Sequence, residues 1–309
     1  MQIKNKIIIL TLILFLQNHN LLAEEFNISA SEISFDKENN ILFGKGSVEV
    51  SDDEGKIIKS DKVTYTKDKE YLLLEGTVSF LDLEGNIIRT DKATYDKIND
   101  IITTFNNTFL ELKNGYLLTT NKIFYYNKEK VISSNQKSTF TDKDKNEINV
   151  TNFQYDVNKN LFSSVGDIKV IDANKNEYVF KEIYVDTLKR NMIGSDVSVT
   201  LDQENFGTTQ ENDPRFVAND ILITKDKSEL SKAVFTVCKK RDDKCPPWSI
   251  KAKKISHDKI KKTIYYDHAT LMVYDVPIFY FPKFFHPDPS VKRQSGFLSP
   301  LFSNSNTLG

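Results

Sequence analysis

The chain has 309 residues, of which 39% are hydrophobic, and this content is enough for a core and excludes a disordered chain. Its 42 Lys and Arg residues nearly balance its 43 Asp and Glu residues, so no overall field favours a nucleic acid or an anionic membrane surface as partner. The 13 tyrosines and 21 phenylalanines, set beside 11 glycines, favour strands over helices.

The N-terminal segment has the pattern of a secretory signal. Lys4 and Lys6 form a basic region, residues 7–16 form an apolar run, and Ala23 ends a short stretch of small and apolar residues before acidic Glu24. We therefore predict a signal peptide over residues 1–23 and a mature chain that starts at Glu24. The apolar run is too short to span a bilayer as a helix, and an uncleaved anchor is the alternative.

The mature chain repeats itself with a period of thirty residues. Equivalent segments read S-E-I-S-F-D at residue 31, D-K-V-T-Y-T at 61, D-K-A-T-Y-D at 91, N-K-I-F-Y-Y at 121, T-N-F-Q-Y-D at 151 and K-E-I-Y-V-D at 181. The turn-forming residues Gly55, Gly85 and Gly115 keep the same spacing, as do Gly46 and Gly76. A repeat of this kind predicts stacked, similar structural units.

Within each unit, apolar and polar residues alternate with period two, as in half-buried strands. A unit of thirty residues holds two strands or a little more and cannot bury its apolar face alone, so successive units must stack around one continuous interior. The polar alternate positions then face water, as in antiparallel sheets. The sequence therefore predicts an all-β structure of stacked repeats in two sheets.

The A-D-K-x-x-Y-D-like repeat resembles the OstA-like domains, and the resemblance covers roughly residues 26–275. It implies a folded-over β-jellyroll of the OstA and LptA kind, whose two sheets form an open trough for lipid A acyl chains. Inward-facing side chains would contact those chains through apolar burial alone. The residues expected to do so are Phe35, Val63, Tyr65, Val78, Phe80, Tyr95, Leu110, Tyr125 and Phe140.

The pattern becomes less regular after Asn191. We expect a loop over residues 206–214, a strand over 216–225, a further unit from Asn219 to Trp248, and a last unit that opens at Ala252 and continues through 263–273. This part is longer than the usual domain of this kind.

The two cysteines, Cys238 and Cys245, lie on either side of the charged segment K-K-R-D-D-K. In an oxidising compartment, this spacing favours a mutual disulfide that closes the tip of a hairpin. The alternative is pairing with a segment further along the chain.

Near residue 276 the chain becomes aromatic and proline-rich. The segments W-S-I-K-A at residue 248, V-P-I-F-Y-F-P at 276 and K-R-Q-S-G-F-L-S-P at 292 together resemble the junction of the LptD family, the outer-membrane lipopolysaccharide assembly proteins also called organic solvent tolerance proteins. The resemblance implies a periplasmic domain over residues 24–275 and the start of an outer-membrane β-barrel, truncated at Gly309, over 276–309. Pro277, Pro282 and Pro300 would each delete a ladder hydrogen bond, so that the seam between barrel strands parts more easily and acts as a lateral gate. The alternative is that these prolines merely shape the linker between the two domains.

The resemblance also implies function and partners. Lipopolysaccharide would arrive from the periplasmic bridge protein LptA, which would add a strand at residues 26–35, and would pass to the barrel and its lipoprotein partner LptE at the outer membrane. The alternatives are a soluble bridge protein of the LptA or LptC kind and a structural β-repeat scaffold without lipid.

No catalytic or cofactor-binding motif surrounds the mature chain's three histidines, His257, His268 and His286, so we expect neither an enzyme nor a cofactor. The segment D-K-D-K-N-E at residue 142 has some likeness to a calcium loop, but it lacks the glycine at position six and the glutamate at position twelve. We expect it to form a charged turn, and we expect no metal site.

Overall fold

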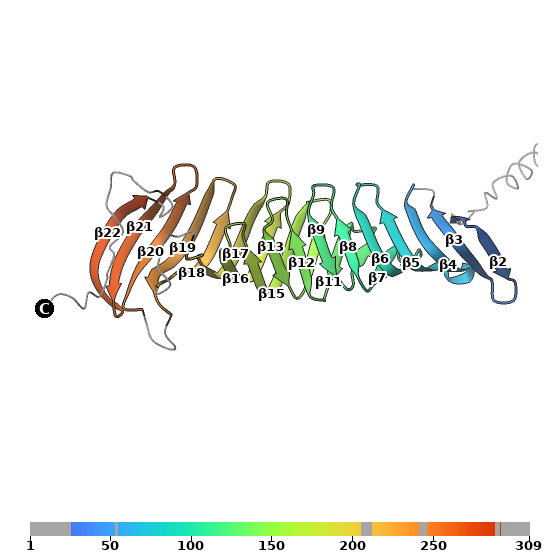
Figure 1. Cartoon of the computed structure of the whole chain (residues 1–309), viewed down its shortest axis with the longest axis horizontal. Coiled ribbons are helices and arrows are strands. Elements are labelled where there is room, and N and C mark those ends of the chain that lie inside the picture. The colour runs from blue at the N-terminus through green and yellow to red at the C-terminus, as the bar shows by residue number, and fades with distance from the viewer. Residues whose placement is uncertain (1–25, 53–54, 205–211, 241–245, 288–290, 292–309) are drawn as a thin grey trace, which may run out of the picture.

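The computed structural model describes residues 26–52, 55–204, 212–240, 246–287 and 291. These residues form one continuous antiparallel sheet of 22 strands that run across the long axis of an elongated molecule (Figure 1). The expected signal peptide, and the segment 292–300 with Pro300, lie outside the described residues. No helix within the described ranges is long and apolar enough to cross a bilayer.

The elements in chain order are β1 (Asn27–Ser29), β2 (Glu32–Asp36), β3 (Ile41–Ser51), β4 (Ile57–Thr66), the 3-10 helix η1 (Lys67–Lys69), β5 (Tyr71–Leu81), β6 (Ile87–Asp96), β7 (Ile101–Phe105), β8 (Thr108–Glu111), β9 (Leu117–Thr120), β10 (Phe124–Tyr126), β11 (Val131–Ser134), β12 (Ser138–Thr141), β13 (Glu147–Val150), β14 (Phe153–Asp156), β15 (Leu161–Ile171), β16 (Glu177–Asp186), β17 (Asn191–Thr200), β18 (Asn212–Ile223), β19 (Lys227–Cys238), β20 (Trp248–Asp258), β21 (Thr263–Val273) and β22 (Val276–Pro287).

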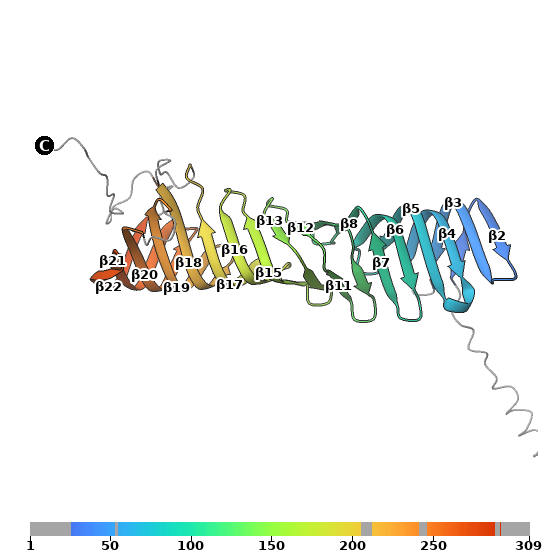
Figure 2. The same ribbon diagram turned by 90° about the horizontal axis from the view of Figure 1, so that it is seen from below.

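The sheet is folded over into two facing layers. The two halves of β6 pair with different strands, β7 and β8, and the two halves of β15 pair with β14 and β13. Between them, β7, β10, β11 and β14 form the first layer, and β8, β9, β12 and β13 form the second. In Figure 2, β8, β12 and β13 lie along one side of the molecule and β7 and β11 along the other. The longer strands outside this region pass through both layers.

Alternate strands turn the corner between the layers at a residue with positive φ. Gly46, Gly76, Asn106, Gly166 and Asp196 occupy this position at multiples of the thirty-residue period. At Gly76 an added Cβ would overlap the Asp61 carboxylate, which accepts a hydrogen bond from the backbone N–H of Thr77. The glycine spacing in the sequence is therefore set by the corner of the fold.

Paired strands carry their inward residues in continuous rows. The inner row of the first layer runs through Phe35, Leu42, Tyr65, Leu72, Tyr95, Ile102, Tyr125, Ile132, Tyr155, Phe162, Val185 and Met192. The inner row of the second layer runs through Val50, Ile58, Phe80, Ile88, Leu110, Leu118, Phe140, Ile148, Val170, Tyr178, Val199 and Phe216. The predicted all-β, folded-over jellyroll of stacked thirty-residue units is confirmed.

Two rows of hairpin turns lie opposite the corner. The first turn row contains the positive-φ residues Asn40, Glu70, Asp100, Lys130, Asn160 and Arg190, and the second contains Gly55, Gly85, Gly115, Lys145 and Lys175. In the second row, Asp142 accepts hydrogen bonds from the backbone N–H groups of Asp144 and Asn146, at 2.8 and 2.9 Å. The segment 142–147 is thus the charged turn that its sequence predicts. We call the side of the molecule between the two turn rows the mouth.

Strand boundaries in this part differ from the sequence prediction, since β18 ends at Ile223 and not at residue 225, and β20 begins at Trp248 and not at Ala252. The strand expected over residues 216–225 begins at Asn212, so β18 includes Pro214, which was expected in a loop. The proline fits because the pairing of β18 with β19 is irregular between Asn212 and Arg215, so no ladder donor is needed there. The Pro214 carbonyl instead accepts a hydrogen bond from the backbone N–H of Leu201 at 2.9 Å.

Candidate ligand groove

Polar contacts across the mouth tie the two turn rows together over much of the length. Lys56 Nζ lies 3.7 Å from Asp100 Oδ1, and Lys130 Nζ lies 3.1 Å from Glu84 Oε1. Farther along the chain, the Asn114 side-chain amide donates a hydrogen bond to Thr187 Oγ1 at 2.8 Å. These contacts join residues that are far apart in sequence. The two ionic contacts close the groove beside β4 to β11, and the Asn114 contact reaches the turn after β16.

Beneath these contacts the interior is filled by the side chains that the sequence assigns to lipid. Eight of the nine expected lipid-contacting residues are no more than 5% exposed, and they pack into the core; they are Val63, Tyr65, Val78, Phe80, Tyr95, Leu110, Tyr125 and Phe140. The ninth, Phe35, lies on the same inner row but is 46% exposed because β2 is the terminal strand. Phe26 fills the N-terminal part of the groove beside β4 and β6, where its ring packs against Tyr65 and Tyr95.

The interior opens farther toward the C-terminus. A cavity of about 670 Å³ lies between the layers from β13 to β21, within the usual size range of ligand pockets. None of the nine expected residues lines it. Its apolar walls come from Ile148, Val170, Tyr178, Val185, Met192, Val199, Leu201, Phe216, Ile221, Ile223, Leu230, Ile255 and Ile264.

The mouth of this cavity has two lips of opposite charge. Asp142, Asp144 and Asp172 lie on the turns of the second turn row. Arg190 lines the mouth from the turn after β16. Lys259 and Lys262 line it from the turn after β20. The pKa of Lys259 is lowered because its ammonium is partly buried, although Asp172 and Asp226 attract the charged form. Apolar walls beneath charged lips suit an amphiphile whose chains enter the groove and whose polar part stays at the mouth.

The cavity begins where a row of aromatic residues ends. Phe35, Tyr65, Tyr95, Tyr125 and Tyr155 follow one another at the thirty-residue period on the first inner row, and the next position holds Val185. Val185 is followed along the same row by Met192 and Ile223, which also line the cavity. Because valine replaces a tyrosine ring at this position, side chains do not fill the interior there. The change from tyrosine to valine at the repeat position is visible in the sequence, but it was not used to predict the site.

A second hollow of about 710 Å³ lies on the outer face of β8 to β16. Its lining includes Thr119, Thr139, Asn149 and Lys169, which belong to the outward alternation of the strands. Phe109 and Val179 also line it, but the hollow lies on the outer face of a single layer, whereas the other cavity lies between the two layers, so we place the candidate site in the interior cavity.

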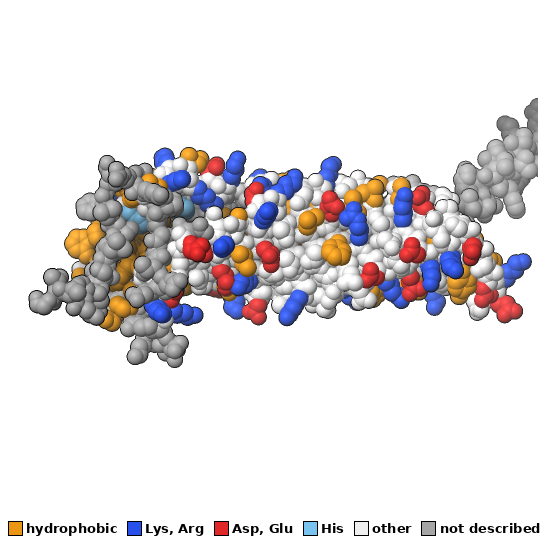
Figure 3. Space-filling view, in the orientation of Figure 1, with side chains coloured by type: hydrophobic (Ala, Val, Ile, Leu, Met, Phe, Trp, Pro, Cys, Tyr) orange, Lys and Arg blue, Asp and Glu red, His pale blue; other side chains and the backbone are white. Residues whose placement is uncertain are grey.

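The last described strand, β22, pairs with β21 and is an edge of the sheet. Pro277 lies where the pairing shifts register, and Pro282 has no partner in the regular ladder, so both prolines occupy positions where a donor is not used. Apolar side chains gather at this end of the molecule (Figure 3); Val276, Ile278, Phe279, Tyr280 and Phe285 are each more than half exposed. The gate assigned to Pro277, Pro282 and Pro300 stays a prediction.

Of the two cysteines, only Cys238 is among the described residues. Cys238 ends β19, with its Sγ 3.7 Å from the Trp248 carbonyl oxygen, while Cys245 lies outside the described residues. Their mutual disulfide stays a prediction. Within the described ranges, no group of three His, Cys, Asp or Glu side chains is arranged to hold a metal ion.

Comparison with known proteins gives one sequence match of limited extent. No family model matches the chain. The LPS-assembly protein LptD of Nitrosomonas europaea is 28% identical over 152 residues, which cover 46% of this chain and 20% of that protein. The matched part thus spans about a fifth of the length of this curated relative.

Among solved structures, a similarity is found to LptH of Pseudomonas aeruginosa, described as the LptA homologous periplasmic component of the conserved lipopolysaccharide transport device. The similarity covers 56% of this chain and 82% of that chain, with 14% sequence identity and a TM-score of 0.18. A likeness at this score carries no argument about function.

Proposed function

We propose that this chain is a non-enzymatic module of lipopolysaccharide transport and that the cavity between β13 and β21 holds lipid acyl chains. The observation that carries the proposal is the combination of apolar walls and charged lips around about 670 Å³ of unfilled interior. The sequence match to an LPS-assembly protein supports the choice of lipid. Burial of acyl chains against such walls supplies the affinity, since each buried methylene contributes about 0.8 kcal/mol.

The wider role that we propose is passage of the lipid along the groove toward the outer membrane. Lipopolysaccharide would enter from a periplasmic bridge protein of the LptA kind at the β1 and β2 edge and leave toward a barrel beyond β22. One feature supports entry at this edge: β1 and β2 pair only with β3, so their other edges carry no strand within the described residues. Such an edge can accept a strand from a partner. Outer-membrane location and an LptE partner belong to the same proposal.

Two other roles compete with this one. A soluble bridge protein would use the same groove, and it would differ in having no barrel to deliver to. A structural scaffold would bind no lipid at all. The unfilled cavity favours a ligand-binding role over the scaffold, because a core selected only for stability would be close-packed throughout.

The lipid-binding role predicts a large difference between two neighbouring substitutions. Met192 lines the cavity, whereas Ile193 is 54% exposed on the opposite face of β17. Met192→Glu should weaken lipopolysaccharide binding at least about tenfold, because a carboxylate would stand among the acyl chains. Affinity can be measured by displacement of a fluorescent fatty-acid probe from the purified protein.

The matched variant Ile193→Glu should bind as the parent does, and circular dichroism should show that both variants remain folded. Equal affinities for the two variants would argue that lipid does not occupy the cavity. Absence of binding by the folded parent would favour the scaffold.

A further inference from the structure

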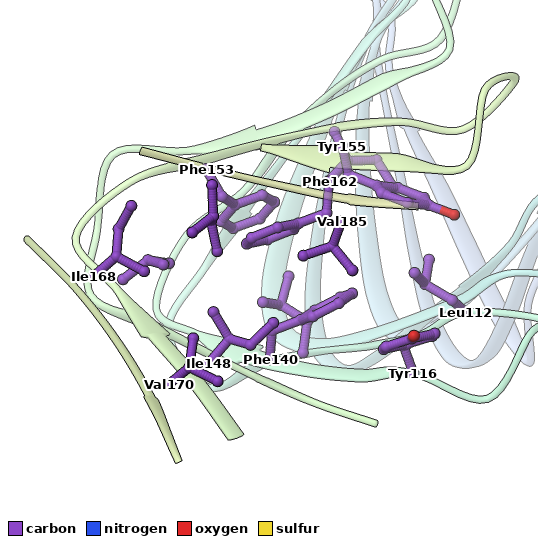
Figure 4. Close-up of a cluster of buried hydrophobic side chains, with 14 of the residues drawn as sticks. Leu112, Tyr116, Phe140, Ile148, Phe153, Tyr155, Phe162, Ile168, Val170 and Val185 are labelled. Carbon is purple, nitrogen blue, oxygen red and sulfur yellow. The ribbon is translucent and has the colours of Figure 1, made fainter. Parts of the chain in front are cut away.

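A stack of aromatic rings divides the interior at the N-terminal end of the cavity. Phe140 of β12 stacks on Phe162 of β15, with ring centroids 4.6 Å apart, and Phe162 stacks on Phe153 of β14 at 5.7 Å. Figure 4 shows these rings reaching toward one another from opposite layers, with Ile148 beside Phe140. Because Phe140 pairs with Ile148, the stack directly adjoins the cavity wall. We call Phe140, Phe153 and Phe162 the plug.

An ionic contact across the mouth is coupled to the plug through one side chain. The Arg190 guanidinium lies 3.5 Å from Asp142 Oδ2 and also contacts the Asp144 carboxylate. Tyr116 lines the same cavity as Arg190, whose guanidinium interacts with the Tyr116 hydroxyl and opposes the rise in the Tyr116 pKa that burial causes. The Tyr116 ring stacks on Phe140 at 5.0 Å with an interplanar angle of 15°. We call Arg190, Asp142 and Asp144 the clasp. Movement of the clasp can therefore reach the plug through Tyr116.

We propose that the clasp and plug form a gate between the cavity and the filled part of the groove, and this inference rests on the proposed lipid-binding function. Any acyl chain that moves along the interior past Ile148 must displace Phe140 and Phe162, since their rings fill the space between the layers. The clasp resists separation of the turn rows above them. Its contact to Asp144 is weak enough to open, because the Arg190 and Asp144 side chains are 40% and 61% exposed to water, while the Asp142 side chain beneath is 13% exposed and its contact to Arg190 is the longer one, at 3.5 Å.

The gate predicts where lipid is captured when the clasp is removed. A photoreactive diazirine amino acid at Ile223 would report on the cavity, and one at Leu118 on the filled groove beyond the plug. Arg190→Gln should raise lipopolysaccharide capture at Leu118 roughly fivefold, the factor that corresponds to about 1 kcal/mol of exposed ion pairing, and leave capture at Ile223 unchanged. Raising the salt concentration to 1 M should have the same effect on the parent and little effect on Arg190→Gln.

A neighbouring cation provides the control. Lys189 lies on the same turn and pairs with Asp186, so Lys189→Gln should leave both capture yields unchanged. Capture at Leu118 that does not respond to Arg190→Gln or to salt, or that is absent from every variant, would overturn the gate while capture at Ile223 persists. Absence of capture at Ile223 in the parent would instead overturn the proposed lipid-binding function, and the gate with it.

Discussion

Replacement of Phe162 by alanine should lower the free energy of unfolding by about 3–5 kcal/mol, the cost expected for removing a buried aromatic ring from a core. Phe162 is fully buried and stacks on Phe140 and Phe153, so its ring joins the two layers at the plug. Close-packed rings on both sides limit how far the site can collapse around the missing atoms. Urea-induced unfolding followed by circular dichroism would measure the change.

Phe109 provides the matched control for this substitution. It lies on β8 with 52% of its surface exposed, so Phe109→Ala should change the free energy of unfolding by no more than about 0.5 kcal/mol. Similar losses for the two variants would show that the two layers do not depend on the stacked rings.

Replacement of Lys56 by alanine should cost about 3–5 kcal/mol of stability, because it would remove a buried ammonium from between the Asp52 and Asp100 carboxylates, which are 8% and 17% exposed. Lys56 Nζ lies 3.4 Å from Asp52 Oδ2 and 3.7 Å from Asp100 Oδ1, and its side chain is only 5% exposed. Asp100 also accepts hydrogen bonds from the Tyr95 hydroxyl at 2.7 Å and the Asn127 amide at 2.9 Å. The substitution therefore disturbs a network that holds the two turn rows together, and urea-induced unfolding would again measure the loss.

Lys59 tests whether burial, and not charge alone, sets this cost. Its ammonium lies 3.3 Å from Glu49 Oε2, but the two side chains are 65% and 47% exposed. Water screens such a pair, so Lys59→Ala should cost less than about 1 kcal/mol. If Lys56→Ala were as mild as Lys59→Ala, the ionic contacts across the mouth would not hold the groove closed.

The repeat in the sequence was enough to predict the alternation of strands and turns and the inward faces, but not the division of residues 101–156 into the short strands β7 to β14. The reason is local: a period of two fixes which side chains share a face, and positions such as Gly76 and Gly85 need a positive φ at a corner or a turn. The final unit followed the same logic, since β21 spans the predicted residues 263–273. Pro214 was wrongly expected in a loop. A strand accepts this proline only because its pairing with β19 is irregular between Asn212 and Arg215, and the sequence does not show that irregularity.

The state of the interior could not be read from the repeat. Whether an inward row is filled or open depends on side-chain volumes summed across two layers, and the contacts that close the mouth join distant residues such as Lys56 and Asp100 or Asp142 and Arg190. The sequence therefore predicted lipid contacts for Tyr65, which is buried in packed core, and gave no weight to Met192. A change in residue size at one repeat position, such as the valine at 185, is the sequence feature that indicates where the interior is open.

Site-specific photo-crosslinking at Met192 tests the central claim most directly, namely that the cavity between β13 and β21 holds acyl chains. A diazirine amino acid at Met192 faces the cavity, one at Ile193 faces water on the same strand, and one at Tyr65 lies in the filled groove. With lipopolysaccharide bound to the folded protein, the account predicts strong capture at Met192 and background capture at the other two positions. Capture at Ile193 equal to that at Met192, or capture at Tyr65 with none at Met192, would contradict it.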